Sequence, residues 1–449
     1  MTETFARVAE FALNRPADQM PDSAREAAAL MLLDTLGIVI ASTPMEAGVI
    51  ARDTAALLYG STDPAFSARM LCDGRRVSLA GAAYAAATQT DNLDGHDGYN
   101  PTKGHIGVVV VPALAVLAQH CPDLTGPEAL AAVIVGYEVA GRAGIALHAT
   151  VSDYHTSGAW NALGVAAMAA RLRGYSPEQL RQALGIAEYH GPRSQMMREI
   201  ANPTMLHDGS GWGALVGMSA AILAERGFTG APAITIEEDR AAPYWQDLGT
   251  FWQMEHQYVK PYPICRWAHA AIDGLRAVMK THGLTHDRIA HVDVHTFHEA
   301  CQLFSGVPQT TSQAQYSLPF AVAVQAVHGR IGVKHLTGSG LADPDVARFM
   351  SRISVRTCDR HSARFPAGRW ADVSVTTRDG QLLHSGDTHA RGGPEAPMLR
   401  QDVIDKFLEF AMPQMGGPAK TLAEAVLDLV EPDVRFDSVA SFLYPGHDR

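Results

Sequence analysis

The sequence contains few cysteines, and they lie far apart. Its 449 residues include Cys72, Cys121, Cys265, Cys301 and Cys358. The number is odd and no two of them form a C-x-x-C pair, which argues against both a disulfide framework and a cysteine zinc site. Because scattered free thiols are typical of proteins kept under reducing conditions, we expect a cytoplasmic location.

Basic clusters and long apolar runs are also missing. The formal net charge is -11 and the lysines and arginines are scattered, so the sequence lacks the basic surface that binds nucleic acids or anionic membranes. The longest uncharged apolar run, residues 106–118, contains a proline and is shorter than the roughly 20 residues that cross a bilayer. The N-terminus has acidic residues and no long apolar stretch. We therefore expect no signal peptide, no membrane segment and no nucleic-acid partner.

The composition is typical of a folded protein with a large helical component. Hydrophobic residues make up 47% of the chain and charged residues 18%, which excludes disorder, and the length predicts two or three domains. From Thr4 to about Gly227, apolar residues recur at helical spacing between Gly, Pro and Asp breaks. We predict that this region is all-helical, with Asp22 and Ser23 capping one buried helix.

After about Arg266 the pattern changes to the alternation of β-strands. Residues 289–297, 353–358 and 371–386 alternate in this way, the last around an Asp-Gly hairpin turn, and the apolar segment 319–329 is helical between them. Helical periodicity returns near the C-terminus. The predicted fold class is therefore mainly α, a large all-helical domain with an inserted smaller α+β domain. The predicted boundaries are 1–265 for the helical domain, 266–396 for the α+β domain, and 397–449 for C-terminal helices that rejoin the helical domain.

A glycine-rich loop with the sequence DNLDGHDGYNPTKGH concentrates ionisable groups ahead of an apolar helix. Several of them are plausible metal ligands: Asp91, Asp94, His96, Asp97 and His105. No frame of the loop has the acid and glycine spacing of a calcium-binding EF-hand. Alternatively, the aspartates cap turns and a helix expected near Pro112. The functional interpretation is favoured because acid, base and cation lie within fifteen residues, beside a helix that cannot solvate them.

Two further segments place ionisable residues at helix starts. His155 precedes an apolar helix, with Thr156 and Ser157 as candidate caps, and a capping or core role for the histidine is the simpler alternative. Lys260, Arg266 and His269 surround two prolines before another helix, where the alternative is a domain junction. Both segments therefore stay candidates for the site.

Three other patterns are weaker. Gly209, Gly211 and Ala214 match the dinucleotide-binding pattern, but a polar turn replaces the required strand. Cys265 and His269 lie four residues apart, but no third group orients them as a nucleophile and base. His291, Asp293 and His295 would share one face of a strand and could hold zinc, although an exposed strand face is the more ordinary explanation.

Seven segments resemble the MmgE/PrpD family in order and spacing. That family contains 2-methylcitrate dehydratase, cis-aconitate decarboxylase and iminodisuccinate epimerase. The resemblance covers nearly the whole chain and identifies the family, not the reaction. The segments are AALMLLDTLGIVIAST, the Asp-rich loop with VVVVPALAVLA, YHTSGAWNALGVAAMAARLRG, SAAILAERGFTG, VKPYPICRWAHAAIDGL, AQYSLPFAVAV and DVIDKF.

The resemblance implies a large helical domain and a smaller α+β lid with the active site between them, usually in a homodimer. It implies that Asp91 corresponds to the first aspartate of the family's D-x-D-D-T loop and His105 to the histidine that closes this loop. His155 corresponds to the histidine before the Ala-rich helix, and His269 to the histidine after the K-P-Y-P segment.

The chain departs from the family pattern at two places. Gly95 stands where the family has threonine, and about three extra residues precede His105. Leu206 and His207 stand where the family has an active-site lysine. Either His207 replaces that lysine, or Lys103 on the longer loop supplies the cation. These departures leave room for an epimerase.

The resemblance and the residues together predict a cofactor-independent enzyme that acts at the carbon next to a carboxylate of a small di- or tricarboxylate. Such chemistry needs a base near neutral pKa and cations that stabilise an enediolate. The predicted catalytic residues are His155, His269, His105 and Asp91, and the predicted substrate-binding residues are Lys103, His207, Lys260 and Arg266. No metal is expected. A lyase similar to 2-methylcitrate dehydratase is favoured, with an epimerase or a non-catalytic carboxylate-binding homologue as alternatives.

Overall fold

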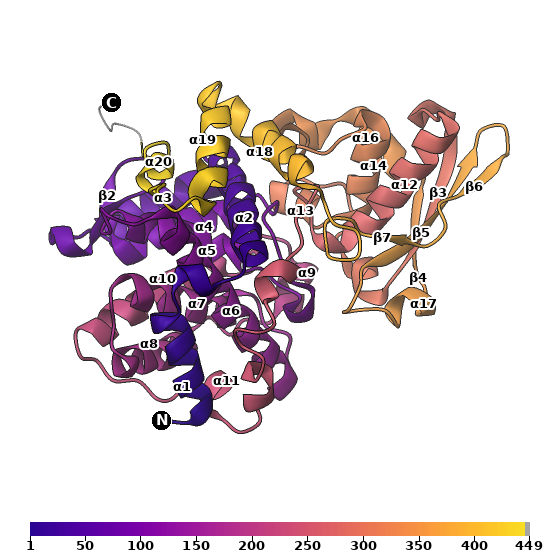
Figure 1. The fold of residues 1–449 in the computed structure, drawn as a ribbon. Coiled ribbons are helices and arrows are strands. Elements are labelled where there is room, and N and C mark those ends of the chain that lie inside the picture. Colours follow the sequence, from indigo (N-terminus) through magenta and orange to yellow (C-terminus); the bar gives the residue numbers. More distant parts are fainter. Residues whose placement is uncertain (445–449) are drawn as a thin grey trace.

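The computed structural model describes residues 1–444, and helices dominate it (Figure 1). This confirms the prediction of a mainly α protein. The N-terminal helices are α1 (Glu3–Ala9), α2 (Asp22–Ala41), α3 (Glu46–Leu58), α4 (Leu79–Asp91), α5 (Gly107–Ala118), α6 (Gly126–Thr150), α7 (Gly158–Leu172), α8 (Pro177–His190), α9 (Met196–Ala201), α10 (Ser210–Glu225) and α11 (Ile234–Glu237).

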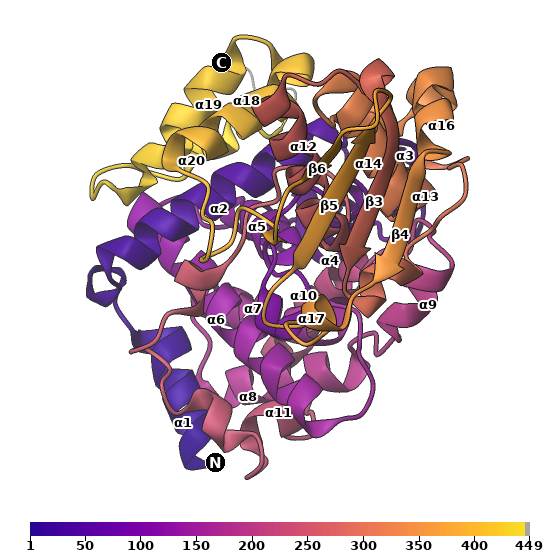
Figure 2. The ribbon, with the colours of Figure 1, turned by 90° about the vertical axis from the view of Figure 1, so that its right-hand side faces the viewer.

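A five-stranded sheet with its own helices follows. Its elements are α12 (His269–His282), β3 (Ile289–Thr296), α13 (Thr311–Gln315), α14 (Leu318–His328), α15 (Val333–Leu336), α16 (Pro344–Met350), β4 (Ile353–Thr357), α17 (Asp359–Ser362), β5 (Trp370–Thr377), β6 (Leu382–His384) and β7 (Thr388–His389). The strand order is β4-β3-β5-β6, with β7 also paired to β5. Only β3 and β4 run parallel. Helices α12 and α14 lie behind the sheet in Figure 2.

The chain ends in helices that return to its N-terminal part. These are α18 (Arg400–Met415), α19 (Pro418–Leu427) and α20 (Asp437–Ala440), drawn in yellow beside α2 in Figure 1. Helix α18 packs along α2. The C-terminal helices therefore pack against elements from the N-terminal part of the chain.

Buried apolar residues form two main cores. The first joins residues of α1 to α8 and α10 with residues of α18 to α20, and the second joins α9, α12, α14 and the sheet. Along the chain, two segments contribute to neither core, namely residues 260–261 and 391–397. The predicted domain boundaries fall next to these segments, and the division into domains stays a prediction.

Small residues let the helices of the first core approach closely. A Cβ atom added to Gly164 of α7 would lie 2.4 Å from the carbonyl oxygen of Gly136 in α6, so the two backbones nearly touch. Helix α6 is long and apolar enough to cross a membrane by length and composition, but 94% of its most apolar window is buried inside the protein. That burial is typical of a helix at the centre of a core.

Three local predictions were wrong. The region predicted as all-helical contains a hairpin of two three-residue strands, β1 (Ser67–Arg69) and β2 (Arg76–Ser78), which are too short to show a clear alternation. Helix α2 begins at Asp22 after Pro21 without a side-chain cap, so neither Asp22 nor Ser23 is its N-cap. Helix α5 begins at Gly107, and Pro112 lies inside it.

Candidate active site

The Asp-rich loop connects the end of α4 to the start of α5 and is buried on several sides. Two lysines from distant segments hold its backbone. Lys406 of α18 donates to the carbonyl oxygen of Gly95 at 2.7 Å and forms an ion pair with the buried Asp34 of α2. Lys260 donates to the carbonyl oxygen of Asp94 at 3.1 Å and to its carboxylate. The loop is therefore fixed by residues far away in the sequence.

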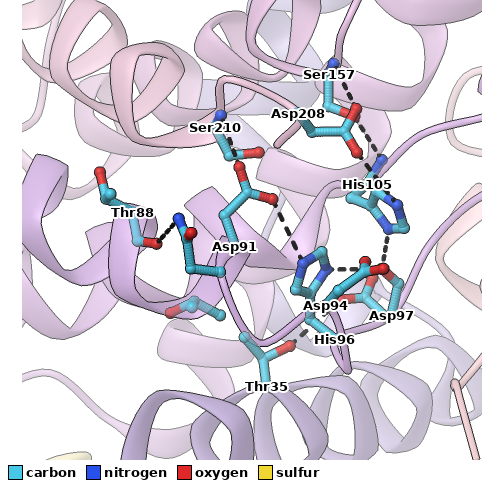
Figure 3. A network of polar contacts seen from close by, with 12 residues as sticks. Thr35, Thr88, Asp91, Asp94, His96, Asp97, His105, Ser157, Asp208 and Ser210 are labelled. Carbon is cyan, nitrogen blue, oxygen red and sulfur yellow. Dashed lines mark hydrogen bonds and ion pairs between the residues drawn. The ribbon is translucent and has the colours of Figure 1, made fainter. Parts of the chain in front are cut away.

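His105 at the end of this loop has a defined orientation (Figure 3). Its Nδ1 lies 2.7 Å from the main-chain carbonyl oxygen of Asp97, and its Nε2 lies 3.5 Å from Oδ2 of Asp208. Asp208 is held in turn by the backbone N–H and the hydroxyl of Ser157, at 3.1 and 2.9 Å from Oδ1. Because a neutral imidazole donates through one nitrogen, the lone pair of His105 is on Nε2.

The burial of these groups changes their protonation. Burial lowers the pKa of His105 and of His96 well below the ordinary value, so both rings are neutral near pH 7. Burial raises the pKa of Asp91 to about 7 and that of Asp94 to about 6. Burial also raises the pKa of Asp208. The network therefore combines neutral bases with carboxyl groups that titrate near neutrality, which is the range that acid–base catalysis uses.

A small cavity of about 20 Å³ lies where the two cores meet. It has room for roughly one water molecule, so it is smaller than any di- or tricarboxylate. Its wall combines four cationic side chains, two carboxyl groups, tyrosines and apolar residues. The lining residues are Asp94, Lys103, His105, Tyr154, Met196, Ile200, Asp208, Tyr258, Lys260, Cys265, Arg266, Trp267, Tyr316 and Arg369.

Three of the four cations in this wall have no carboxylate partner within residues 1–444. Lys103 lies over the ring of Tyr154, and Arg266 lies over the ring of Tyr258, with cation-to-centroid distances of 4.1 and 4.2 Å. Arg266 also donates to main-chain carbonyl oxygens, and so does Arg369. The fourth cation, Lys260, is paired with Asp94. The wall therefore carries an excess of positive charge.

Burial makes this positive charge costly. It lowers the pKa of Arg266 to about 10, and it also lowers the pKa of Arg369 and of Lys103. A buried cation without a counter-ion is stabilised when an anion binds beside it. The cavity is therefore built to accept negative charge, in a chain whose overall charge is negative.

Four of the eight predicted site residues line this cavity, namely Lys103, His105, Lys260 and Arg266. Asp91 lies behind it, where its Oδ2 accepts from the backbone N–H of Ser210 at 3.1 Å and its Oδ1 lies 3.6 Å from Nε2 of His96 (Figure 3). The structure thus brings five of the predicted residues into one connected region.

The other three predicted residues lie elsewhere. Nε2 of His269 is 2.8 Å from the carbonyl oxygen of Ile264, and the backbone N–H of His155 donates to Nε2 of His148 at 3.3 Å. Both histidines are buried outside the set of residues that line the cavity. His207 lines a different groove, and neither of its ring nitrogens has a hydrogen-bond partner within residues 1–444. Ser157, proposed as a cap, binds Asp208 through its hydroxyl instead.

The groove next to His207 is much larger, at about 810 Å³, but its chemistry is different. Its charged lining residues are Arg198, Glu199 and Asp91, so acids outnumber the single cation. Exposed apolar side chains such as Leu206 and Trp212 form part of its wall. An anionic substrate is therefore better matched to the smaller cavity between the cores.

The sequence did not single out several residues of the cavity wall. Arg369 precedes β5 without any local motif, and Asp208 follows His207 in a turn that was interpreted only as a failed dinucleotide pattern. Tyr258 reaches the site through a backbone pairing with Gly98. The sequence offers one signal for Arg369. It is a single arginine directly before a segment with the alternation of a half-buried strand.

Comparisons with known proteins identify a family. The MmgE/PrpD N-terminal domain matches residues 6–242, and the MmgE/PrpD C-terminal domain matches residues 262–430. The chain is 23% identical over 449 aligned residues to a cis-aconitate decarboxylase of Aspergillus terreus, covering 90% of this chain and 89% of that protein. It is also 23% identical to the cis-aconitate decarboxylase of Homo sapiens, covering 84% of this chain and 81% of that protein.

Proposed function

Because the chain belongs to the MmgE/PrpD family, we propose that it is a lyase that breaks a bond next to a carboxylate of a small di- or tricarboxylate. The reaction requires no cofactor in this proposal. The similarity to enzymes named cis-aconitate decarboxylase supports a carboxylate substrate. A dehydratase and a decarboxylase are both consistent with it.

The observation that carries the proposal is the charge of the small cavity. Lys103, Arg266 and Arg369 line it without carboxylate partners within residues 1–444, and they come from both sides of the junction between the cores. Carboxylate groups of a substrate would supply the missing counter-charges. Guanidinium groups bind carboxylates with two parallel hydrogen bonds, which also orients the substrate.

His105 is the proposed base. Its Nε2 carries the lone pair, lines the cavity and lies 3.5 Å from Asp208. In dehydration, Nε2 removes a proton from the carbon next to a carboxylate, and the Asp208 carboxylate stabilises the imidazolium that forms. The C–O bond of the neighbouring carbon then breaks, and the imidazolium returns the proton to the departing hydroxyl, which leaves as water. The negative charge that develops on the substrate carboxylate is stabilised by Lys103, Arg266 and Arg369.

The cavity must open before a substrate enters, because about 20 Å³ is too small for any polycarboxylate. Trp267, Tyr316 and Arg369 belong to the second core or its edge, whereas Lys103 and His105 belong to the Asp-rich loop. A separation of the two parts would therefore open the cavity and split its wall. This is the movement expected of an α+β lid.

Epimerisation is the second candidate, because no lysine stands next to His207 and burial lowers the pKa of His207 to about 3, which keeps this ring neutral. A neutral histidine cannot serve as a cationic donor to a leaving group. An epimerase needs only to remove a proton from one face of a carbon and return one to the other. A non-catalytic carboxylate-binding homologue is the third candidate.

One experiment separates these candidates. The purified enzyme is incubated in heavy water with 2-methylcitrate, citrate, cis-aconitate, iminodisuccinate and tartrate isomers, and proton NMR follows each mixture. A hydro-lyase gives an unsaturated acid, a decarboxylase gives a product shorter by one carbon, and an epimerase incorporates deuterium without forming an alkene. Ligand-induced stabilisation without turnover of any compound would indicate a binding protein and contradict the proposal.

The proposed enzyme is a homodimer in the cytoplasm. The groove next to His207 supports the homodimer, because exposed apolar residues such as Leu206, Trp212 and Ile50 lie along it. Apolar patches of this kind are typical of protein interfaces. Sedimentation equilibrium tests the oligomeric state directly, and a monomer at micromolar concentration would contradict it.

A further inference from the structure

Three residues with metal-binding side chains meet at one end of the sheet. Cys358 follows β4, His361 lies in the short helix α17, and Asp372 lies in β5 (Figure 2). A sulfur, a ring nitrogen and a carboxylate oxygen from these residues all lie within 4.8 Å of one another. His295 of β3 is the cross-strand neighbour of Asp372, and its Nδ1 lies 3.2 Å from Oδ2 of that carboxylate.

One ring nitrogen of His361 faces the carboxylate of Asp372 in this cluster. The residue is fully buried, and its Nε2 lies 2.8 Å from Oδ1 of Asp372. An ion held by both groups replaces the proton between them, so Nε2 binds the ion and Nδ1 keeps the ring proton. Within residues 1–444, this Nδ1 has no hydrogen-bond partner. Because no other group competes for Nδ1, the ring proton can reside there and leave Nε2 free to bind an ion.

We propose that Cys358, His361 and Asp372 form a binding site for a divalent ion of the zinc type. Thiolate, imidazole and carboxylate together are the ligands that zinc accepts, whereas calcium and magnesium prefer oxygen alone. His295 lies outside the group whose ligand atoms are all within 4.8 Å of one another, so it orients the carboxylate of Asp372 and leaves a fourth position open. Binding displaces the proton of the Cys358 thiol to solvent, because the metal ligand is the thiolate.

This site differs from the two zinc possibilities considered from the sequence. The five cysteines contain no C-x-x-C pair, and His291 and Asp293 lie further along the exposed face of β3. Only the fold brings Cys358 and His361 beside the strand residue Asp372. The bound ion would tie the end of β4 and helix α17 to β3 and β5, so its role is structural.

Arg360 competes with a metal ion for the carboxylate of Asp372. Its guanidinium lies 2.8 Å from Oδ1 of Asp372 and 2.7 Å from Oδ1 of Asp387. The Arg360 side chain is 54% exposed, so it can release Asp372 and keep Asp387 when an ion with two charges arrives. If the cluster is only an ion-pair network, Arg360 stays in place and no ion binds tightly.

The test uses the full-length protein, reduced and stripped with a chelator, and Co²⁺ as the probe. Cobalt bound to a thiolate absorbs in the near ultraviolet, so a titration reports both affinity and the cysteine ligand. We expect one ion per chain, displaced by Zn²⁺. Addition of Zn²⁺ should also raise the melting temperature by about 2–4 °C.

Two variants identify the ligands. Cys358→Ser should abolish the thiolate absorption and weaken binding at least tenfold, whereas Cys121→Ser, a half-buried cysteine of the other core, should bind as the wild type does. His361→Gln should weaken binding similarly. If His361→Gln does not fold, protection of Cys358 from alkylation by Zn²⁺ in the wild type decides the question.

The proposal is overturned if the wild type shows no thiolate absorption, or if Cys358→Ser retains it. It is also overturned if Zn²⁺ leaves the alkylation rate of Cys358 unchanged. None of the three residues lines the cavity between the cores. The outcome is therefore independent of the proposed lyase function, since no readout depends on turnover.

Discussion

Nδ1 of His105 lies 2.7 Å from the main-chain carbonyl oxygen of Asp97. This contact assigns the proton of the neutral ring to Nδ1 and directs the lone pair of Nε2 toward Asp208 and the cavity. A backbone carbonyl cannot lose or gain a proton in the physiological range, so the tautomer is independent of pH. The loop therefore supplies a base whose orientation is set by its own backbone.

Replacement of His105 tests this role. His105→Gln keeps a hydrogen-bonding side chain but removes the base, so kcat should fall by about 10²- to 10⁴-fold with a smaller change in KM. Proton NMR of substrate turnover provides the measurement. His120→Gln changes a half-buried histidine that binds the carbonyl oxygen of Ser67, and it serves as the control. A folded His105→Gln enzyme with the wild-type kcat would remove His105 from the mechanism.

The cations of the cavity should determine substrate affinity. Arg369→Met and Lys103→Met should each raise KM by at least about tenfold, because a buried charge that pairs with substrate contributes about 2 kcal/mol or more. Arg364→Met is the control, because Arg364 lies on the same segment as Arg369 but is already paired with Asp387. A lysine without a function would tolerate the change within about 0.5 kcal/mol. A silent Lys103→Met together with an inactive His207→Ala would show that the cation comes from the family's usual position.

The roles proposed for His155 and His269 need a direct test. If each transfers a proton to or from the substrate, His155→Ala and His269→Ala should lower kcat by about 10²- to 10⁴-fold. Each ring lies outside the cavity wall, so a direct role requires that the proposed opening of the cavity exposes it. Circular dichroism confirms that each variant is folded. Near wild-type kcat in both variants would show that the resemblance assigned these two positions wrongly.

The buried carboxyl of Asp97 should make stability depend on pH. Burial raises its pKa to about 7, whereas an unfolded aspartate titrates near about 4. Between these values the folded protein keeps a proton that the unfolded chain has lost, so this group destabilises the fold increasingly as pH rises from about 4 to about 7. Asp97→Asn keeps an acceptor for Thr35 and removes this dependence.

Urea unfolding of both proteins between pH 4 and pH 7 measures the effect. The stability of Asp97→Asn relative to the wild type should increase with pH by about 1 kcal/mol per pH unit. Buried histidines make the free energy of unfolding change with pH in the opposite direction. Both proteins contain these histidines, so their contribution cancels when the two free energies are subtracted. A difference that stays constant with pH would show that Asp97 is ionised throughout.

Chelation should leave turnover intact. The carboxylates nearest the cavity are already bound by protein donors, since Asp94 pairs with Lys260 and Asp208 accepts from Ser157. Activity is measured after exhaustive dialysis against a chelator, together with the metal content of the protein. Loss of turnover that one divalent ion restores would assign Asp91, Asp94 and His105 as metal ligands instead. Removal of an ion from Cys358 should change thermal stability without changing kcat.

The sequence predicted elements with strong periodicity and missed those that depend on distant contacts. The alternation in residues 289–297 and 371–386 became β3, β5 and β6, and the apolar segment before the C-terminus became α18. The hairpin of β1 and β2 was missed because three residues give too short a pattern. The two strands are stabilised by hydrogen bonds to each other, and a strand pair of three residues leaves no recognisable pattern in the sequence.

The candidate site was predictable only where the residues share a segment or a family motif. Lys103 and His105 were found on the Asp-rich loop, and Lys260 and Arg266 beside two prolines. Arg369 and Asp208 were not found, because neither has a local pattern and only tertiary folding brings them to the cavity. Burial also could not be inferred from the sequence, and it determines the protonation of every carboxyl in the loop.

The hydrogen bond from Lys406 to Gly95 has a consequence for how the protein is made on the ribosome. The Asp-rich loop and Asp34, the ion-pair partner of Lys406, leave the exit tunnel early, but Lys406 leaves it only when most of the 449 residues have been translated. Until then the carboxyl group of Asp34 lacks its ion-pair partner. The loop also lacks one of the two lysines that hold its backbone. The nascent chain therefore carries an incomplete site for most of its synthesis, and the enzyme should become competent only after its last helices have docked.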